Sequence, residues 1–381
     1  MKFSRCFSFA FAFSTIMANT SFANTPEDVL NHYSSTRCKI DGQITDNLVG
    51  LANPVVGAKV AVYREPSTKI VKNISGLFHA LDENDLVSIE INRVGLKMKA
   101  CRVDDTNIVF FYGPVSNQGL PFFWRVGAVK VPGDITTYDN PVDPLILESP
   151  HEGYDGTLRA SVALMAQTKA RVLILNSVHR NASDENASCQ APHKISDAAH
   201  SVSTVFHKGH AILSSLYPAA FFVQVHGMVK HEEMHMLVVN GFNSNFTTQN
   251  KSGARLFGLS IAEYFQEDPL PPNPNSDFYP DGVQYSKFSF CADFPKGPDD
   301  QLLFRRPTGC HNTNVQAHQL NGGSQCSKGN EDEGRFMHIE LDTTFRLPSA
   351  YLESRLERLA DSLNSAMVKW THNDDPAWKN N

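Results

Sequence analysis

Histidine and acidic side chains follow short apolar runs at three points after residue 144, at His151, His226 and Glu340. Two neutral imidazoles, a carboxylate and a water molecule are the usual ligands of a catalytic zinc ion, and a separate base takes the proton of that water. His151 and His226 would supply the imidazoles, while Glu340 would act as the base and later as the acid. The pattern predicts a hydrolytic site with one zinc ion.

The acidic ligand is expected just after His151, where the chain offers Glu152 and Asp155. The side chain of an immediate neighbour tends to point away from the metal, whereas a loop can bring the fourth residue back. Asp155 is therefore favoured, and Glu152 is the alternative.

Four further side chains are candidates for substrate binding. His179 and Arg180 follow another apolar run, and Arg255 and Arg346 lie further along the chain. A guanidinium group offers two parallel donors, which suit a substrate carboxylate or an oxyanion. For His179 and Arg180, the alternative is a core imidazole and a surface cation.

A second metal motif competes with this site. The segment from His231 to His235 matches HExxH, which on a helix places two histidines on one face with the glutamate as base. Glu233 puts a charge on the side of such a helix that is normally apolar, and the residues after His235 resemble a strand. A zincin-type metalloprotease with Glu263 as third ligand is one alternative function, and a secreted binding protein without catalysis is another.

The elements expected to position these residues form an α/β fold. Strands that are buried on both faces read as near-continuous apolar runs, and ligands of open α/β sheets bind outside the carboxyl ends of the strands. The fold class is therefore a mixed, mostly parallel sheet sandwiched by helices. One of the expected helices would carry His200 and His207 on one face. The apolar runs cover residues 145–147, 172–175, 221–225 and 336–339, and the expected helices cover 157–169, 196–215 and 349–370.

The segment before residue 134 has a different pattern. From residue 24 to 133, short apolar or β-branched runs alternate with turns rich in Gly, Pro and Asn, which indicates a small β-rich N-terminal region. An accessory or prodomain-like module is favoured over the opening strands of the main sheet, and residues 134–381 would form the zinc-hydrolase-like domain. The runs cover residues 55–63, 87–94, 108–112 and 122–131.

Composition narrows the class of protein. The chain has 381 residues, of which 41% are hydrophobic and 19% charged, and its formal net charge is −6. These values exclude a disordered chain, a coiled coil and a basic nucleic-acid binder. No nucleic acid is therefore expected as a partner.

Residues 1–23 are expected to be a signal peptide. Lys2 and Arg5 precede an apolar run, and the segment Ser21-Phe22-Ala23 fits the small residues of a cleavage site. The run is about half as long as a membrane span, and no later stretch approaches that length, so no membrane span is expected. The mature protein would be secreted or periplasmic.

Cysteine usage agrees with export. Of the seven cysteines, six remain once Cys6 leaves with the signal peptide. An even number in an exported protein suggests disulfides, and the pairing is open because six cysteines allow fifteen pairings. Buried free thiols are the alternative. The six residues are Cys38, Cys101, Cys189, Cys291, Cys310 and Cys326.

Three segments together resemble a known family. The tripeptide Ser149-Pro150-His151, the pair His226-Gly227 and residues 336–341 are similar to the layout of the zinc carboxypeptidase superfamily. The nearest branches are the N-formylglutamate amidohydrolases and the phage poly-γ-glutamate hydrolases. The likeness runs from Leu145 to Leu347, and it implies a phosphorylase/hydrolase-like sandwich with one zinc ion and Glu340 as base.

The chain departs from the superfamily at one position. The acidic ligand of that family lies three residues after the first histidine, where this chain has Tyr154. A standard peptide-trimming carboxypeptidase is therefore disfavoured. The resemblance implies hydrolysis of an amide near a carboxylate, in a small acylated or γ-linked amino acid or peptide. Residues 196–200 and 310–316 also look like elements that recur in uncharacterised secreted relatives.

Overall fold

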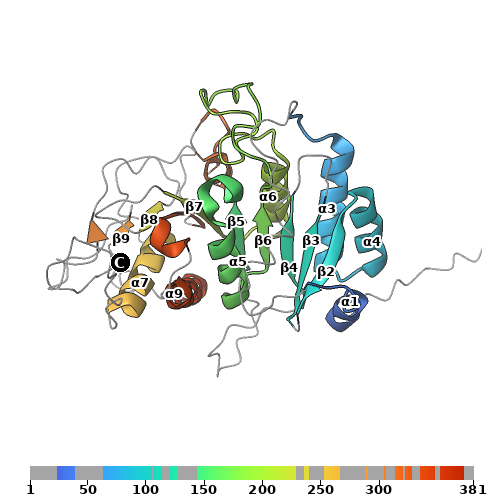
Figure 1. The fold of residues 1–381 in the computed structure, drawn as a ribbon, viewed down its shortest axis with the longest axis horizontal. Helices are drawn as coiled ribbons and strands as arrows, with labels where there is room; N and C mark the ends of the chain where they lie inside the picture. The colour runs from blue at the N-terminus through green and yellow to red at the C-terminus, as the bar shows by residue number, and fades with distance from the viewer. Residues whose placement is uncertain are drawn as a thin grey trace, which may run out of the picture.

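The structure is a computed structural model, in which the described residues form one sheet with helices beside it (Figure 1). Within these residues, no helix combines the length and the apolar character needed to cross a membrane. The expected signal peptide, the HExxH segment and the boundary at residue 133 lie outside them. The described residues are 24–38, 63–104, 106–113, 120–127, 144–228, 236–239, 253–266, 288–290, 304–305, 314–320, 322–327, 335–347 and 352–372.

The described strands form a sheet of mixed direction. They are β1 (Arg37–Cys38), β2 (Lys99–Val103), β3 (Ile108–Tyr112), β4 (Phe122–Arg125), β5 (Leu145–Ser149), β6 (Val172–Leu175), β7 (Phe221–Gly227), β8 (Met236–Val239), β9 (Phe288–Phe290), β10 (Phe304–Arg305) and β11 (Phe336–Leu341). Their order is β1-β2-β3-β4-β6-β5-β7-β11-β8-β9-β10. The four central strands β6, β5, β7 and β11 are parallel, and β4 and β8 pair with them antiparallel. The predicted mixed, mostly parallel sheet is confirmed.

Helices cover both faces of this sheet. They are α1 (Pro26–His32), α3 (Thr68–Asp82), α4 (Leu86–Gly95), α5 (Leu158–Gln167), α6 (Val205–Leu216), α7 (Gly253–Gln266), α8 (Val315–Leu320) and α9 (Leu352–His372). Leu145 and Leu147 of β5 pack in one core with α5, α7 and α9, whereas Ile146 packs in a second core with α3, α6 and α8. Successive strand residues point to opposite faces, and both faces are buried. This burial explains why the central strands are apolar almost without interruption.

Two of the three expected helices are confirmed as α5 and α9, but the third begins later than expected. Helix α6 starts at Val205, where the Thr204 hydroxyl accepts the N–H of His207 at 3.0 Å as an N-cap. Before it, Asp197 accepts the N–H of Ala199 at 3.2 Å. Such local side-chain bonds compete with helix formation. His200 therefore lies in a turn, and the expectation that it shares a helix face with His207 is wrong.

The N-terminal region contains helices as well as strands. Residues 87–94 were expected to be a strand and instead form α4, which Asp85 caps and whose Ile89 is fully buried. A capping side chain at the start outweighs the strand preference of the β-branched residues in this run. The runs at 108–112 and 122–125 are strands β3 and β4 as expected. Strand β4 pairs with β6, so these strands continue the main sheet.

Candidate metal centre

The order in which the chain adds strands to the sheet changes side between β5 and β7, at the centre of the sheet. From β5 the chain passes through α5 to β6 on one side, whereas from β7 it continues to β8 on the other side. Ligands of open α/β sheets bind outside the carboxyl ends of the strands at such a switch point. His151 follows β5 and His226 lies near the end of β7, and both imidazoles are buried there together with the Asp155 carboxyl.

A wide turn brings Asp155 back toward His151. Residues Glu152–Gly156 form a single π-type turn, in which the N–H groups of Tyr154 and Asp155 both donate to the His151 carbonyl, at 2.9 and 2.7 Å. The N–H of Gly227 then donates to Asp155 Oδ2 at 3.2 Å. Single π turns occur often at functional sites, and this one places the fourth residue after His151 beside its ring.

Three atoms converge at a spacing that fits a metal ion. Asp155 Oδ2 lies 3.5 Å from His151 Nδ1 and 3.4 Å from His226 Nδ1. The edge of a tetrahedron around zinc, with bonds of about 2.0 to 2.1 Å, is about 3.3 Å. Both distances exceed the usual N–H···O range, and among the described residues His151 Nδ1 has no hydrogen-bond partner. The residues therefore fit a zinc ion.

Ring orientation separates this cluster from two others. Three groups bring possible ligand atoms within 4.8 Å of one another among the described residues. An imidazole nitrogen directs its lone pair in the plane of the ring, so two rings that bind one ion cannot be stacked in parallel. The rings of His151 and His226 lie at 82°, whereas the paired rings of the other groups lie at 13° and 6°. The other groups are His193, Asp197 and His200, and His226, His338 and Glu340.

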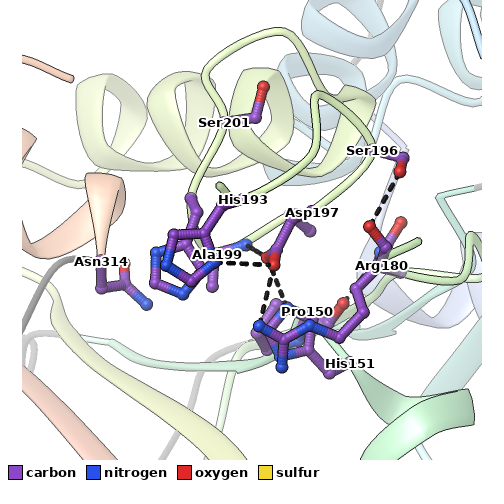
Figure 2. Close-up of polar contacts among 12 residues, drawn as sticks. Pro150, His151, Arg180, His193, Ser196, Asp197, Ala199, Ser201 and Asn314 are labelled. Carbon is purple, nitrogen blue, oxygen red and sulfur yellow. Dashed lines mark hydrogen bonds and ion pairs between the residues drawn. The ribbon is translucent and has the colours of Figure 1, made fainter. Parts of the chain in front are cut away.

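Asp197 holds the far side of the His151 ring. Its Oδ1 accepts His151 Nε2–H at 2.7 Å, and its Oδ2 lies 2.9 Å from an Arg180 nitrogen and 3.5 Å from His193 Nδ1. Figure 2 shows these contacts meeting at the Asp197 carboxylate. When Nε2 of a neutral imidazole donates, its Nδ1 carries the lone pair, which here faces Asp155. A carboxylate behind a ligating histidine is the usual support of a zinc site.

Charge states in the cluster suit metal binding. Burial lowers the pKa of His226 to about 4, and the nearby His338 acts in the same direction, so the His226 imidazole is neutral at pH 7. Burial alone would raise the pKa of Asp155, but its contacts with His151 and His226 outweigh burial and hold that pKa well below its usual range. Burial also disfavours the charged form of His151, yet Asp155 and Asp197 raise its pKa overall. Binding of a cation to His151 Nδ1 would therefore compete with protonation of that ring.

Glu340 lies beside the proposed ligands. It pairs in register with His226 across the parallel strands β11 and β7. Its Oε1 accepts His338 Nε2–H at 2.8 Å, and the His338 ring stacks on His226 with centroids 4.1 Å apart. Burial raises the pKa of Glu340, but the His338 contact outweighs it and the net pKa is about 2. Glu340 is therefore an ionised carboxylate at neutral pH.

The expected substrate-binding residues take different positions. Arg180 lies over the Tyr154 ring at 5.4 Å, and His179 packs edge-on against the same ring. Tyr154 is 57% exposed, so these three side chains lie at the surface next to the buried cluster. The side chains of Arg255, on α7, and of Glu152, the alternative acidic ligand, lie outside the described part of the structure.

Arg346 clamps the ends of three segments. Its guanidinium donates to the carbonyls of Asp155, Met228 and Leu341, the last at 2.9 Å. These contacts are with the main chain, and the expected contact of Arg346 with a substrate stays a prediction. Glu263, the third ligand of the zincin alternative, is exposed on α7 and pairs with Lys369 at 2.9 Å.

Gly227→Ala is expected to weaken zinc binding by about 10- to 100-fold, the usual cost of losing an outer support of a metal site. A Cβ at Gly227 would lie 2.6 Å from the Asp155 carbonyl and 2.7 Å from Arg346 Cζ, so the Asp155 turn must move. Competition with a zinc chelator measures the change. Gly209→Ala is the control, because its Cβ meets only the end of the Leu120 side chain at 3.0 Å. Equal affinities in the two variants would contradict this prediction.

Two disulfides are present among the described residues, Cys38–Cys101 and Cys189–Cys326. Cys291 and Cys310 lie outside these residues. The Cys189–Cys326 disulfide ties down the loop that carries Asp197. Next to it, Gln190 donates to the Gln325 carbonyl at 3.0 Å and contacts His200 at 3.1 Å.

Replacing Cys189 and Cys326 together with serine is expected to lower the free energy of unfolding by about 2 to 5 kcal/mol. Because the loop with Asp197 loses its tether, zinc affinity should also fall, by up to about tenfold. The matched control replaces Cys38 and Cys101, whose disulfide joins β1 to β2 at the far edge of the sheet. Chemical denaturation and zinc titration of both variants measure the two effects. A similar loss of zinc affinity in the control would show that the tether does not act on the site.

Several residues of the site are absent from the sequence-based prediction. Gln224 and His338 lie two residues before His226 and Glu340, and a period of two places each pair on one face of its strand. That period was the available signal. Asp197 lies within residues 196–200, to which only the resemblance points, and no local period indicates its contact with His151, which joins segments that are 46 residues apart.

No protein-family model matches this chain, and no curated protein matches it. Similar solved structures include a metallo-carboxypeptidase from Burkholderia cenocepacia, 10% identical, which covers 68% of this chain and 62% of that chain with a TM-score of 0.32. The chain thus spans less than two thirds of the length of that carboxypeptidase.

Two further similar structures are succinylglutamate desuccinalase from Vibrio parahaemolyticus and N-formylglutamate amidohydrolase from Ralstonia eutropha JMP134. The first is 7% identical, covers 81% of this chain and 84% of that chain, and has a TM-score of 0.34. The second is 11% identical, covers 61% of this chain and 95% of that chain, and has a TM-score of 0.32. The names agree with the resemblance stated from the sequence. At these identities and TM-scores, the case for a function comes from the side chains of the site.

Proposed function

We propose that this chain is a secreted or periplasmic zinc-dependent hydrolase that cleaves an amide bond close to a carboxylate. The observation that carries the proposal is the convergence of His151 Nδ1, His226 Nδ1 and Asp155 Oδ2 beside Glu340 at the switch point of the sheet. The two disulfides support export, because disulfides persist in oxidising compartments.

The donor set favours zinc among the common metals. Two imidazoles and one carboxylate are the ligands of many catalytic zinc sites, whereas Mg²⁺ and Ca²⁺ prefer oxygen donors. Held by His151, Asp155 and His226, a zinc ion would supply a Lewis acid that polarises a carbonyl and lowers the pKa of a water molecule. Asp197 keeps the His151 lone pair directed at the ion, and the Gly227 N–H holds the Asp155 carboxylate in place.

Glu340 moves the proton. As an ionised carboxylate, it takes a proton from the attacking water, and the water oxygen bonds to the amide carbon. Glu340 then gives this proton to the leaving nitrogen as the C–N bond breaks, which returns the carboxylate to its starting state. His338 positions the carboxylate for both steps by donating to Oε1.

The surface next to the cluster suits a substrate that carries a negative charge. Arg180 is partly exposed there, beside the aromatic ring of Tyr154 and the imidazole of His179. A carboxylate close to the scissile amide would be attracted to this guanidinium group. The proposed substrates are therefore small acylated or γ-linked amino acids or peptides.

The test measures bound zinc and hydrolysis in the purified chain. N-formyl, N-acetyl, N-succinyl and γ-glutamyl derivatives of glutamate are compared with the same compounds carrying carboxamides in place of carboxylates. We expect one zinc per chain, hydrolysis of at least one carboxylate-bearing compound, loss of activity on chelation and its return with zinc. Stoichiometric zinc without turnover of any compound would instead indicate a binding protein, and absence of bound zinc would overturn the proposal.

A further inference from the structure

A row of buried polar side chains lies behind His226, on the side away from Asp155. Gln224 of β7, Glu148 of β5 and His210 of α6 are each 0% exposed. Glu148 and Gln224 are register partners on neighbouring parallel strands. Burial of these polar groups costs free energy unless each group makes its hydrogen bonds. Donors and acceptors must therefore match along the row, and the match shows which nitrogen of each imidazole carries a hydrogen.

The contacts in this row form a chain. His226 Nε2 lies 2.8 Å from Gln224 Oε1, and Gln224 Nε2 donates to Glu148 Oε2 at 3.0 Å. The other carboxyl oxygen, Oε1, lies 2.7 Å from His210 Nδ1. Asp197 supports His151 directly, whereas the support of His226 passes through an amide to a carboxylate.

Donor and acceptor rules fix the direction of these bonds. A carboxylate only accepts, so Gln224 must turn its NH₂ group toward Glu148 and its carbonyl oxygen toward His226. That oxygen also only accepts, so His226 Nε2 must carry the hydrogen. In the neutral ring Nδ1 then carries the lone pair, which faces Asp155.

Asn314 supports the same amide orientation independently. Its Oδ1 accepts the backbone N–H groups of Gln316 and Ala317, at 2.9 and 3.3 Å, so its NH₂ group is identified without ambiguity. This NH₂ group donates to Gln224 Oε1. The atom that faces His226 is therefore the oxygen of Gln224, as the contact with Glu148 requires.

We propose that Glu148 is a positioning residue of the metal centre, which acts through Gln224 to hold His226 as the Nε2–H tautomer with its Nδ1 lone pair toward the metal. The proposal rests on the proposed function for the identity of the metal. The tautomer itself is a property of the metal-free chain.

The first test removes the acceptor at each step of the row. Glu148→Met and Gln224→Met keep the approximate length of the side chains and delete their polar groups. We expect zinc affinity to fall by about 10- to 100-fold in each, the range for outer supports of metal ligands. The control is Ser260→Ala, which deletes a buried hydroxyl on α7 and should leave zinc affinity unchanged.

The second test exchanges the two groups. In Glu148→Gln combined with Gln224→Glu, the carboxylate at 224 accepts from His226, and the amide at 148 donates to that carboxylate while its oxygen accepts from His210. The bond between positions 148 and 224 reverses its direction, but His226 Nε2 still faces an oxygen that only accepts. We expect this double variant to bind zinc within about threefold of the wild type, where RT ln 3 is below 1 kcal/mol. If the row had only a structural role, the exchanged variant would not bind zinc more tightly than Glu148→Met and Gln224→Met.

The deciding readout is the tautomer of His226, measured by ¹⁵N NMR of the imidazole nitrogens in the metal-free chain at pH 7. We expect Nε2–H in the wild type and the exchanged variant, and a shift toward Nδ1–H in Gln224→Met and Glu148→Met. An unchanged tautomer and unchanged zinc affinity in folded Glu148→Met would overturn the proposal. Because the tautomer is read without zinc, failure of the proposed hydrolase function would be seen separately.

Discussion

Replacing His151 with alanine is expected to abolish stoichiometric zinc binding, whereas replacing His235 with alanine leaves it intact. His151 supplies one of three converging ligand atoms, so its loss should exceed the roughly 100-fold effect of an outer support. Without the ring, Asp155 and Asp197 also face each other across a buried gap, which disfavours retention of the native geometry. Zinc content after dialysis against a weak chelator measures the result, and thermal unfolding checks that the variant folds.

The same experiment decides between the candidate acids. Asp155→Ala should lose zinc as His151→Ala does, and Glu152→Ala should keep it, because Asp155 Oδ2 is the oxygen that lies between the two imidazoles. Zinc retained in His151→Ala and lost in His235→Ala would replace this site with the HExxH zincin. If Asp155→Ala retained zinc and Glu152→Ala lost it, Glu152 would be the acidic ligand.

Glu340→Gln is expected to keep zinc and to lower kcat by about 10²- to 10⁴-fold, the usual contribution of a general acid–base group. The amide has nearly the same shape, but it cannot accept the proton of the attacking water or return it to the leaving nitrogen. Its oxygen can still accept from His338, so the position of the side chain should change little. Steady-state kinetics and zinc analysis on the same sample measure both effects.

The split between kcat and KM identifies the role of Glu340. Loss of proton transfer lowers kcat, whereas loss of a substrate contact made equally in the ground state raises KM. His338→Ala is the companion variant, and it should lower kcat less than Glu340→Gln because the carboxylate remains. A Glu340→Gln enzyme with normal kcat would remove Glu340 from the proton path.

The arrangement of strands could be predicted because it follows from local rules. Parallel strands that are covered on both faces are apolar throughout, and their carboxyl ends share one edge, so the sequence alone predicts that His151, His226 and Glu340 lie together. The four apolar runs are the central strands β5, β6, β7 and β11.

The supports of the site could not be predicted in the same way. Asp197 and Glu148 act through contacts with residues 46 and 62 to 76 positions away, which no local period reveals. The β-branched run at 87–94 became a helix because of its Asp85 cap. Likewise, the apolar pattern predicts a helix for the segment before α6, whereas the side chains of Asp197 and Ser201 accept backbone N–H groups there and form turns.

The π-type turn after β5 has a consequence for how such sites are recognised in sequences. Three residues of an ordinary α-helix rotate about the helix axis by about 300°, and four residues of a wider π turn rotate by about 330°. In a π turn, an acid four residues after a histidine therefore lies at nearly the same angle around the axis as an acid three residues after a histidine in an α-helical turn. The extra residue, Tyr154, is displaced outward and is 57% exposed. The pairing of His151 with Asp155 thus depends on an angle around the axis of the turn, and a pattern that counts residues alone would pass over it.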